Sequence, residues 1–493
     1  MTEYVRARQR SGPLPLSTKI YQGIGALPDS YKTWAFNTFL LIYYNQVLGL
    51  SASSASIAIM IALIVDALFD PLVGSFSDNL RTRWGRRHPL MYAAVIPLAV
   101  ALYLLFTPPA GLSHSGLFAW LTTFAIGTRM AMAFFLVPWS ALFAEFSDDY
   151  VERSQIVTYR HLCGWIGAVT FTTLVWSFVF PTIPKSESQP AIPGQLVAQN
   201  YALFAMVLAI CVGLAAFLTT YLTRREVPYL LQPVETGQRF GMGQVFHDLK
   251  LAFSNREFVV LVIAVLGFSA IAGANTALEI YMQTYFWGLL PEDIRWFGLA
   301  ILGTLAAFVL ITPLQRRFDK KQLLIGTLVV SLVNGMLFVG MRFADVLPAN
   351  GDPLLLPILI VYAVVTIAML TITLIMFSSM IADLLDAQEL ATGKRQEGMF
   401  SAALSLATKA TSGLGLFFAG LILEYVIHFP TGAKPGTLDP EIVTRLGVVV
   451  GLVLPIFYAL PLYLTSRYRL TRAGHAEIQA ALNRRRAEAT AAN

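Results

Sequence analysis

Two aspartates, Asp66 and Asp70, interrupt an apolar stretch that runs from residue 54 to residue 77. Residues spaced i and i+4 lie one turn apart on the same helix face, so the two carboxylates are neighbours. A charged side chain at mid-membrane depth costs at least about 2.5–3.5 kcal/mol, and such residues mark functional sites by default. Because the like charges repel and their own helix offers no cation, the pair predicts a site for a positive ion.

A lysine, Lys409, interrupts a later segment, residues 396–427. If this segment approaches the one that carries Asp66 and Asp70, two carboxylates face one ammonium, which leaves one unit of negative charge. One Na⁺ or H⁺ would neutralise it, whereas an empty site would leave a buried charge unpaired. We therefore expect a cation site at Asp66, Asp70 and Lys409, with the aspartates as metal ligands if the ion is Na⁺. The alternative is a fixed salt-bridge triad that only joins the two segments.

Other polar and aromatic residues in the apolar segments are candidates for binding a substrate. The candidate set is Asp29, Lys32, Asn37, Trp139, Arg160 and Glu279. Tyrosine and tryptophan suit sugar stacking, but they also commonly anchor helices at the membrane interface. For Arg129 and Glu279, pairing with each other across the bundle is the favoured role.

Motifs of enzymes are missing from the sequence. It has no phosphate-binding loop of the Gly-x-x-x-x-Gly-Lys-Ser/Thr type, and its six histidines are scattered without metal-ligand spacing. Cys163 and Cys211 both fall inside apolar segments and read as small buried hydrophobic residues. We expect no enzymatic activity and no cofactor other than the cation, Na⁺ or H⁺, that would occupy the site at Asp66 and Asp70.

The elements that must position these residues are membrane helices. Hydrophobic residues make up 56% of the 493 residues and charged residues 13%, with a mean hydropathy of +0.63. A soluble chain carries about 25% charged residues, so this one has too little polar surface for water. No apolar region follows the charged start, so we expect no cleavable signal peptide.

Twelve apolar segments are long enough to cross a bilayer. They are residues 22–49, 54–77, 89–108, 115–146, 155–180, 198–223, 256–289, 293–313, 322–341, 354–384, 396–427 and 441–466. Short basic turns at matching places suggest two repeats. The expected domains are a cytoplasmic segment (1–21), two six-helix bundles (22–223 and 256–467), a connector (224–255) and a basic tail (468–493).

Lysines and arginines are concentrated in every second loop, that is, in the loops on one side of the membrane. Such an excess marks the cytoplasmic side and sets the orientation. We expect both termini in the cytoplasm and a location in a bacterial-type inner membrane. The net charge of +6 is explained by this bias and by anionic lipid. No nucleic-acid partner is needed, and we expect a monomer.

The charged residues and motifs of these apolar segments and of the loops between them resemble those of the glycoside-pentoside-hexuronide:cation symporters, the melibiose permease-like branch of the major facilitator superfamily. The resemblance runs through most of the chain and is carried by Tyr43-Tyr44, Val47-Leu48-Gly49-Leu50, Asp66-Ala67-x-x-Asp70-Pro71 with Gly74, Arg83-Trp84-Gly85-Arg86-Arg87, Val137-Pro138, Ala144-Glu145, Glu152-Arg153, Tyr159-Arg160, Ala382-Asp383, Gly393-Lys394-Arg395-x-Glu397-Gly398 and Lys409. It implies an all-α membrane protein, with twelve helices in two six-helix bundles related by pseudo-two-fold symmetry.

The resemblance also implies roles for single residues. Asp66 and Asp70 match the cation-site carboxylates of the family, Lys409 the lysine beside them, and Arg160 an arginine on the sugar-facing side of the fifth helix. Residues that match a cytoplasmic gate are Asp78, Arg83, Asp383, Lys394, Arg395 and Glu397. Two sugar-binding aspartates of melibiose permease correspond here to Ser30, which follows Asp29, and to Leu136, so the galactoside-binding pair is not reproduced.

The sequence thus leads to a cation-coupled symporter that imports a sugar or glycoside by alternating access. A symporter of a lysophospholipid-like amphiphile is the alternative within the same family. A membrane receptor or scaffold that transports nothing is the alternative of another class, and it has no use for the charged triad.

Overall fold

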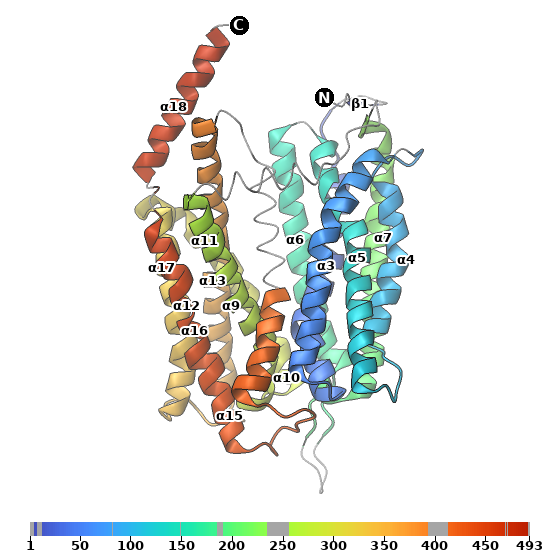
Figure 1. Cartoon of the computed structure of the whole chain (residues 1–493), viewed down its shortest axis with the longest axis vertical. Coiled ribbons are helices and arrows are strands. Elements are labelled where there is room, and N and C mark those ends of the chain that lie inside the picture. The colour runs from blue at the N-terminus through green and yellow to red at the C-terminus, as the bar shows by residue number, and fades with distance from the viewer. Residues whose placement is uncertain are drawn as a thin grey trace. The chain divides into compact units, whose positions relative to one another are not determined.

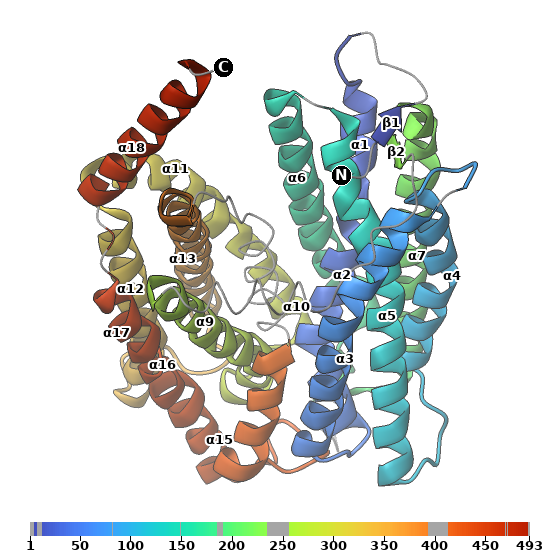
Figure 2. The ribbon, with the colours of Figure 1, turned by 45° about the horizontal axis from the view of Figure 1, so that its top comes forward.

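The computed structural model describes residues 4–6, 12–80, 82–147, 149–184, 191–233, 256–392, 413–468, 470 and 472–491. Lys394, Arg395, Glu397 and Lys409 lie outside the described residues, so the roles expected for them remain predictions. Helices account for nearly all of the described secondary structure (Figure 1). The exception is an antiparallel pair, β1 (Tyr4–Arg6) with β2 (Leu231–Pro233) (Figure 2). Helices suit an apolar chain because they satisfy every backbone polar group within one segment.

Ten of the described helices are long and apolar enough to cross a membrane. They are Ala52–Asn79, His88–Leu105, His114–Phe146, Val151–Val179, Ala198–Tyr229, Arg256–Phe286, Pro291–Arg317, Lys320–Phe343, Leu355–Ala387 and Pro440–Arg467. Gly413–Ile427 is a shorter apolar helix at the place of the expected eleventh segment. The first expected segment is broken into α1 (Leu16–Ile24), α2 (Leu27–Ala35) and two π-helical turns. The all-helical membrane architecture is as expected, whereas the total of twelve spans remains a prediction.

The chain forms two compact units. Unit 1 contains residues 1–240, 290–295 and 416–438, and unit 2 contains residues 241–289, 296–415 and 439–493. The α-helices of unit 1 are α1, α2, α3 (Ala52–Asn79), α4 (His88–Leu105), α5 (His114–Phe146), α6 (Tyr150–Leu174), α7 (Ala198–Thr223) and α10 (Pro291–Ile294), and residues 416–427 of the helix Gly413–Ile427 also belong to it. Those of unit 2 are α9 (Arg256–Tyr281), α11 (Ile301–Arg317), α12 (Lys320–Phe343), α13 (Leu355–Thr392), α15 (Pro440–Gly447), α16 (Leu454–Ile456), α17 (Ala459–Arg467) and α18 (Arg472–Ala491).

Two helices in equivalent places of the sequence halves end in the same way. The π-helical turns η2 (Tyr43–Val47) and η6 (Met282–Phe286) are followed by Gly49 and Gly288, which have φ of 78° and 65°. After each glycine, a leucine amide donates to the carbonyl six residues earlier, at 2.8 Å in both cases. Glycine is favoured here because it reaches the left-handed region without steric cost. The same ending occurs at a third helix, where His428 has a φ of 57° and the Phe429 amide donates to the Leu423 carbonyl at 2.8 Å. The two-repeat architecture expected from the sequence therefore stays a prediction.

Within unit 1, an aromatic cluster anchors the first helical segment. The Tyr43 ring stacks on Tyr201 at 4.0 Å, and Phe39 packs against Phe180 and Phe204 at 4.8 and 4.9 Å. These rings are almost fully buried. Their packing holds this segment against α7 and the end of α6.

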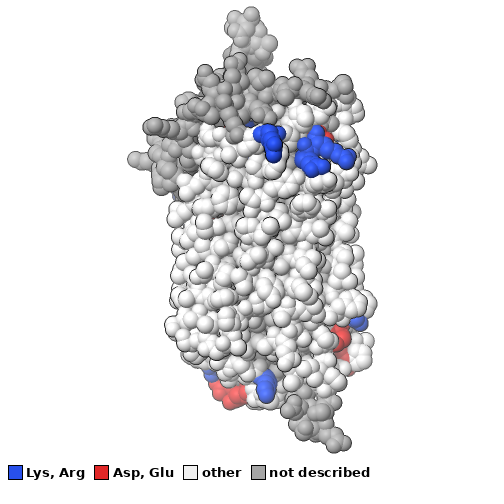
Figure 3. Space-filling model, turned by 90° about the vertical axis from the view of Figure 1, so that its right-hand side faces the viewer, with Lys and Arg blue, Asp and Glu red and all other residues white. Residues whose placement is uncertain are grey.

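The outside of the molecule is apolar where a bilayer would surround it. On the face drawn in Figure 3, the described Lys, Arg, Asp and Glu side chains are visible only toward the two ends. Large apolar side chains elsewhere are also strongly exposed, for example Ile96 at 72% and Val309 at 74%. Exposed apolar surface of this extent is typical of a chain that contacts lipid.

Candidate functional site

A buried ion pair joins two long helices of unit 1. Asp66 on α3 and Arg129 on α5 are 6% and 5% exposed, and Arg129 Nη1 lies 3.5 Å from Asp66 Oδ2. The two helices pack side by side along their length. The guanidinium also lies over the Phe36 ring, 5.6 Å from its centroid. A buried ion pair of this kind is costly to break, because removing either partner leaves an uncompensated charge.

Arg129 interacts with more than one carboxylate. Arg129 interacts electrostatically with Asp29 and Asp70 as well as with Asp66. Asp29 in turn accepts a hydrogen bond from Lys32 Nζ at 2.9 Å. We call Asp29, Lys32, Asp66, Asp70 and Arg129 the charge cluster. Its three acidic and two basic side chains sum to one negative charge, so a single monovalent cation would neutralise it.

The partner of Asp66 is the feature that sequence reasoning missed. Arg129 pairs with Asp66, and Glu279, on α9 in unit 2, accepts from Gln283 Nε2 at 3.0 Å. The mutual pairing of Arg129 and Glu279 that was favoured from the sequence would join unit 1 to unit 2, and it stays a prediction. A signal was present in the sequence, since an intramembrane arginine needs a carboxylate and Asp66 was already known to need a cation.

The structure does not add a further set of metal ligands to the cluster. Among the described residues, no group of three or more His, Cys, Asp or Glu side chains is arranged to hold a metal ion. The cation site expected at Asp66 and Asp70 stays a prediction. Lys409 falls outside the described residues, and its expected place beside them stays a prediction.

A second constellation lies on α1, α5 and α6. Trp139 is 3% exposed, its Nε1 donates to the Gln22 carbonyl at 3.1 Å, and Gln22 Nε2 donates to the Trp139 carbonyl at 2.8 Å. The Arg160 guanidinium stacks on the indole, with its Cζ 3.9 Å from the ring centroid. The two hydrogen bonds fix the indole, and the stacking holds the guanidinium flat on it. The indole N–H is used by Gln22, so the donors that this arrangement presents to a hydroxyl or carboxylate group are those of the Arg160 guanidinium.

One of the remaining candidates also carries an unsatisfied polar atom. The side-chain oxygen of Asn37 is buried and has no hydrogen-bond partner among the described residues. Buried polar atoms are normally hydrogen-bonded, so an exception calls for a reason such as an absent ligand. Asn37 thus stays a substrate-binding candidate, and so do Asp29 and Lys32, which belong to the charge cluster.

The gate candidates lie at the helix ends that carry the arginine-rich turns, which we call the basic ends. Asp78 pairs with Arg87 at 2.6 Å and with Arg86 at 3.7 Å, and both arginines also contact Glu145. Arg83 instead stacks on its neighbour Trp84, 5.4 Å from the ring centroid.

In unit 2, Asp383 is held by residues from two other elements. Both of its carboxylate oxygens accept from Lys320 Nζ at 2.7 Å, and His475 on α18 lies 3.5 Å from it. His475 and Gln479 also contact Asp386, at 3.1 and 2.6 Å, so α18 docks onto the basic end of α13. The sequence motif identified Asp78 and Asp383, but it did not reveal which basic residues hold them.

Comparisons with known proteins agree with this geometry. The model of the family described as MFS/sugar transport protein matches residues 21–472. A Synechocystis protein named as an uncharacterised symporter is 27% identical, over 96% of this chain and 97% of its own length. The mouse sphingosine-1-phosphate transporter MFSD2B is 25% identical, over 90% of this chain and 87% of its own length.

The solved structures lead to the same fold. The crystal structure of the nucleoside transporter NupG superposes with a TM-score of 0.59 at 13% sequence identity, and the match covers 92% of this chain and 98% of that one. At this identity the likeness shows the fold alone. These matches are with transporters, not with enzymes. Since the family model spans most of the sequence, the chain belongs to the MFS/sugar transport protein family, as a multi-pass integral membrane protein.

Proposed function

We propose that this protein is a secondary symporter that moves a sugar or glycoside together with Na⁺ or H⁺. The observation that carries the proposal is the charge cluster built around the buried Asp66–Arg129 pair, whose five described side chains sum to one negative charge. Membership of a sugar-transport family and the similarity to a protein named as a symporter support it. A receptor or scaffold would carry the cost of these buried charges without using them.

The net charge supplies a mechanism for coupling. Counted without Lys409, the cluster carries one net negative charge. Closing a low-dielectric cavity around a net charge is unfavourable, and binding one monovalent cation removes that penalty. The ion therefore favours the closed states through which a loaded transporter passes, which is a population shift with a defined electrostatic origin. We assign the ion to Asp66 and Asp70.

Arg129 changes the role proposed for Lys409. With three carboxylates, Arg129, Lys32 and Lys409 together, the cluster would be neutral before any ion enters. The ammonium of Lys409 and the coupling ion would then be alternatives for the same negative charge. Lys409 would occupy the cluster when the ion leaves, and the returning ion would displace it.

For the substrate, we propose that the Trp139–Arg160 stack and Asn37 contact sugar hydroxyls. The guanidinium N–H groups of Arg160 are suitable donors for sugar hydroxyls, and the buried indole of Trp139 holds the guanidinium in position. Glu279, on unit 2, completes the candidate set. The amphiphile alternative is favoured by the mouse sphingosine-1-phosphate transporter among the relatives. An amphiphile would need a continuous apolar cleft in place of convergent polar groups.

We further propose that the basic ends face the cytoplasm of a bacterial-type inner membrane, as the distribution of Lys and Arg favours. A monomer contains both six-helix bundles that alternating access requires. Asp78 and Asp383, with Lys394, Arg395 and Glu397, would hold the cytoplasmic gate when it is closed.

A proteoliposome uptake assay tests the proposal. Panels of labelled glycosides and of lysophospholipids are offered under an imposed Na⁺ gradient and, separately, under a proton gradient. Accumulation of a glycoside with one of the gradients is the expected result, whereas accumulation of an amphiphile would select the alternative. Uptake that neither gradient drives would refute symport.

A charge variant then tests the assigned site. Asp70→Asn should lose gradient-driven accumulation more than passive exchange, because it removes the charge that the ion neutralises. Asp345→Asn is the matched control, because Asp345 is exposed and has a φ of 55°, a conformation that asparagine tolerates well. If Asp70→Asn concentrates substrate as well as this control does, the ion site is misassigned.

A further inference from the structure

Pieces of the second half of the sequence are bonded to the N-terminal helices inside unit 1. Residues 290–295 and 416–438 both belong to this unit. Polar contacts attach them at three places: Glu424 to Ser53, Gln46 to residues 430 and 433, and Glu292 to Thr182. All three lie near helix ends remote from the basic ends. Each contact is made at a different helix end, so the pieces 290–295 and 416–438 are attached to the N-terminal helices at three separate points.

Glu424 caps the first turn of α3. Its Oε2 accepts from the Ser53 backbone amide at 2.7 Å, while the Ser51 hydroxyl accepts from the Ser54 amide at 3.2 Å. The first amides of a helix have no partner within the helix, and the helix dipole favours a negative charge at this end. A carboxylate in this position makes a charge-assisted hydrogen bond, which is stronger than a neutral one.

Gln46 holds the loop that follows, from Pro430 to Ala433. Its side-chain Nε2 donates to the Pro430 carbonyl at 3.0 Å, and its Oε1 accepts from the Ala433 amide at 2.9 Å. The side chain is 6% exposed. Both ends of one buried amide are therefore used on the same loop, a contact that no shorter or apolar residue can reproduce.

Glu292 makes the third polar contact. A close helix–helix approach at Gly420 adds to the attachment. Its two carboxylate oxygens accept from the Thr182 amide and hydroxyl at 3.2 and 2.6 Å. At Gly420, in the helix Gly413–Ile427, an added Cβ would lie 2.4 Å from both the Ala52 carbonyl oxygen and Ser56 Cβ. Only a glycine allows this helix to approach the start of α3 so closely.

We propose that Glu424, Gln46 and Glu292 form a latch that closes the pathway at the end opposite the basic ends and that must open once in each transport cycle. The inference rests on the proposed transport function. The latched pieces continue directly in the chain as residues 296–317 and 439–447 of unit 2. When the latch opens, Glu424 leaves the start of α3, the helix that carries Asp66 and Asp70. Helix α3 thus links this gate to the proposed ion site.

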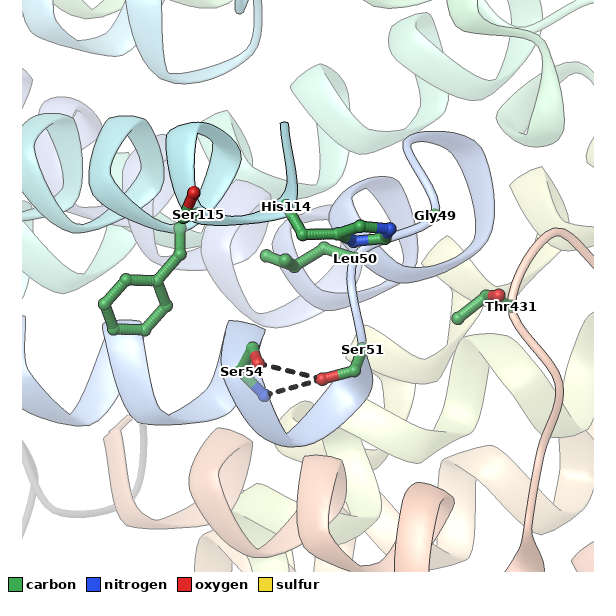
Figure 4. A pocket seen from close by; sticks show the side chains of 8 residues that line it. Gly49, Leu50, Ser51, Ser54, His114, Ser115 and Thr431 are labelled. Atoms are coloured by element: carbon green, nitrogen blue, oxygen red, sulfur yellow. Dashed lines mark hydrogen bonds between the residues drawn. The ribbon is translucent and has the colours of Figure 1, made fainter. Parts of the chain in front are cut away.

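A cavity adjoins the latch, and the accessibility of its walls depends on whether the latch is closed or open. It has a volume of about 560 Å³ and is lined by Gly49, Leu50, Ser51, Ser54, His114, Ser115, Phe118 and Thr431 (Figure 4). Thr431 belongs to the loop that Gln46 holds, and Ser51 and Ser54 flank the amide that Glu424 binds. Opening the latch removes Thr431 from this wall, so side chains next to the cavity become accessible.

Labelling of Ser53→Cys in full-length protein tests the latch without requiring transport. Ser53 is 6% exposed, and its backbone amide survives the substitution. Both native cysteines, Cys163 and Cys211, are free and would first be replaced by alanine. A membrane-impermeant maleimide is applied to the extracytoplasmic side of sealed cells, and the labelling rate is measured.

Glu424→Gln should raise the labelling rate about fivefold, because a charge-assisted hydrogen bond becomes a neutral one. Gln46→Leu should raise it as well. Glu441→Gln is the matched control, since Glu441 is exposed and pairs with Arg445 one turn along its own helix. Parent-like labelling in both latch variants, or an equal rise in the control, would overturn the latch. If the latch variants are labelled faster but neither ion gradient drives uptake by the parent protein, the latch is supported and symport is refuted.

Discussion

Replacing Arg129 with glutamine tests the electrostatic reasoning most directly. At the observed 3.5 Å, a unit charge pair with an effective dielectric constant of about 20 interacts by about 5 kcal/mol. This agrees with the about 3–5 kcal/mol lost when one partner of a buried pair is removed. Counted over Asp29, Lys32, Asp66, Asp70 and Arg129, without Lys409, Arg129→Gln changes the net charge of the cluster from −1 to −2. We therefore expect the folded state to be destabilised by about 3–5 kcal/mol when no cation is available to replace the guanidinium.

The assay is thermal unfolding of the purified protein in detergent, followed by tryptophan fluorescence. Each variant is measured in choline chloride and in the chloride of the coupling ion, or across a pH series if the ion is H⁺. Arg129→Gln should gain more stability from the ion than the parent does, because the ion takes over the role of the lost charge. Asp66→Asn should be destabilised and insensitive to the ion, since its cluster is already neutral.

The double variant Asp66→Asn/Arg129→Gln separates charge from geometry. It restores a net charge of −1 without the buried pair, so its stability should return to within about 1 kcal/mol of the parent and its ion response should recover. Equal ion responses of Arg129→Gln and the parent would refute the charge count. Failure of the double variant to recover would show that Asp66 is needed as a ligand and not only as a charge.

Three further substitutions test the substrate site and the backbone. Arg160→Lys keeps the charge but loses the planar stacking on Trp139, so the KM of uptake should rise by about tenfold with little change in protein stability. Gly25→Ala should raise KM too, because its Cβ would lie 1.9 Å from Trp139 Nε1, whereas Gly326→Ala, with open space around it, should leave KM unchanged. His428 has a φ of 57°, a left-handed conformation that β-branched residues adopt only with strain and glycine adopts without it. His428→Val should therefore be less stable than His428→Gly by about 1–2 kcal/mol in the same unfolding assay. Equal stability of the two variants would contradict this explanation.

Local features of the chain were predictable from the sequence because their causes are local. The spans follow from apolar length, since a segment in lipid must satisfy its own backbone. Asp66 and Asp70 share a helix face because of helical periodicity alone. The long helices of the structure lie where the apolar segments were expected, although α1 begins at Leu16, six residues before the expected start at 22.

The contacts that give the site its chemistry depend on helix packing instead. The Asp66–Arg129 pair joins residues 63 apart, Trp139 and Gln22 are 117 apart, and Glu424 reaches Ser53 across 371 residues. No periodicity in the chain specifies which helices are neighbours or which faces meet. The sequence by itself determined that two membrane aspartates need a positive partner. Only the tertiary structure decided that Arg129 is one of these partners, because the packing of α3 against α5 brings its guanidinium to Asp66.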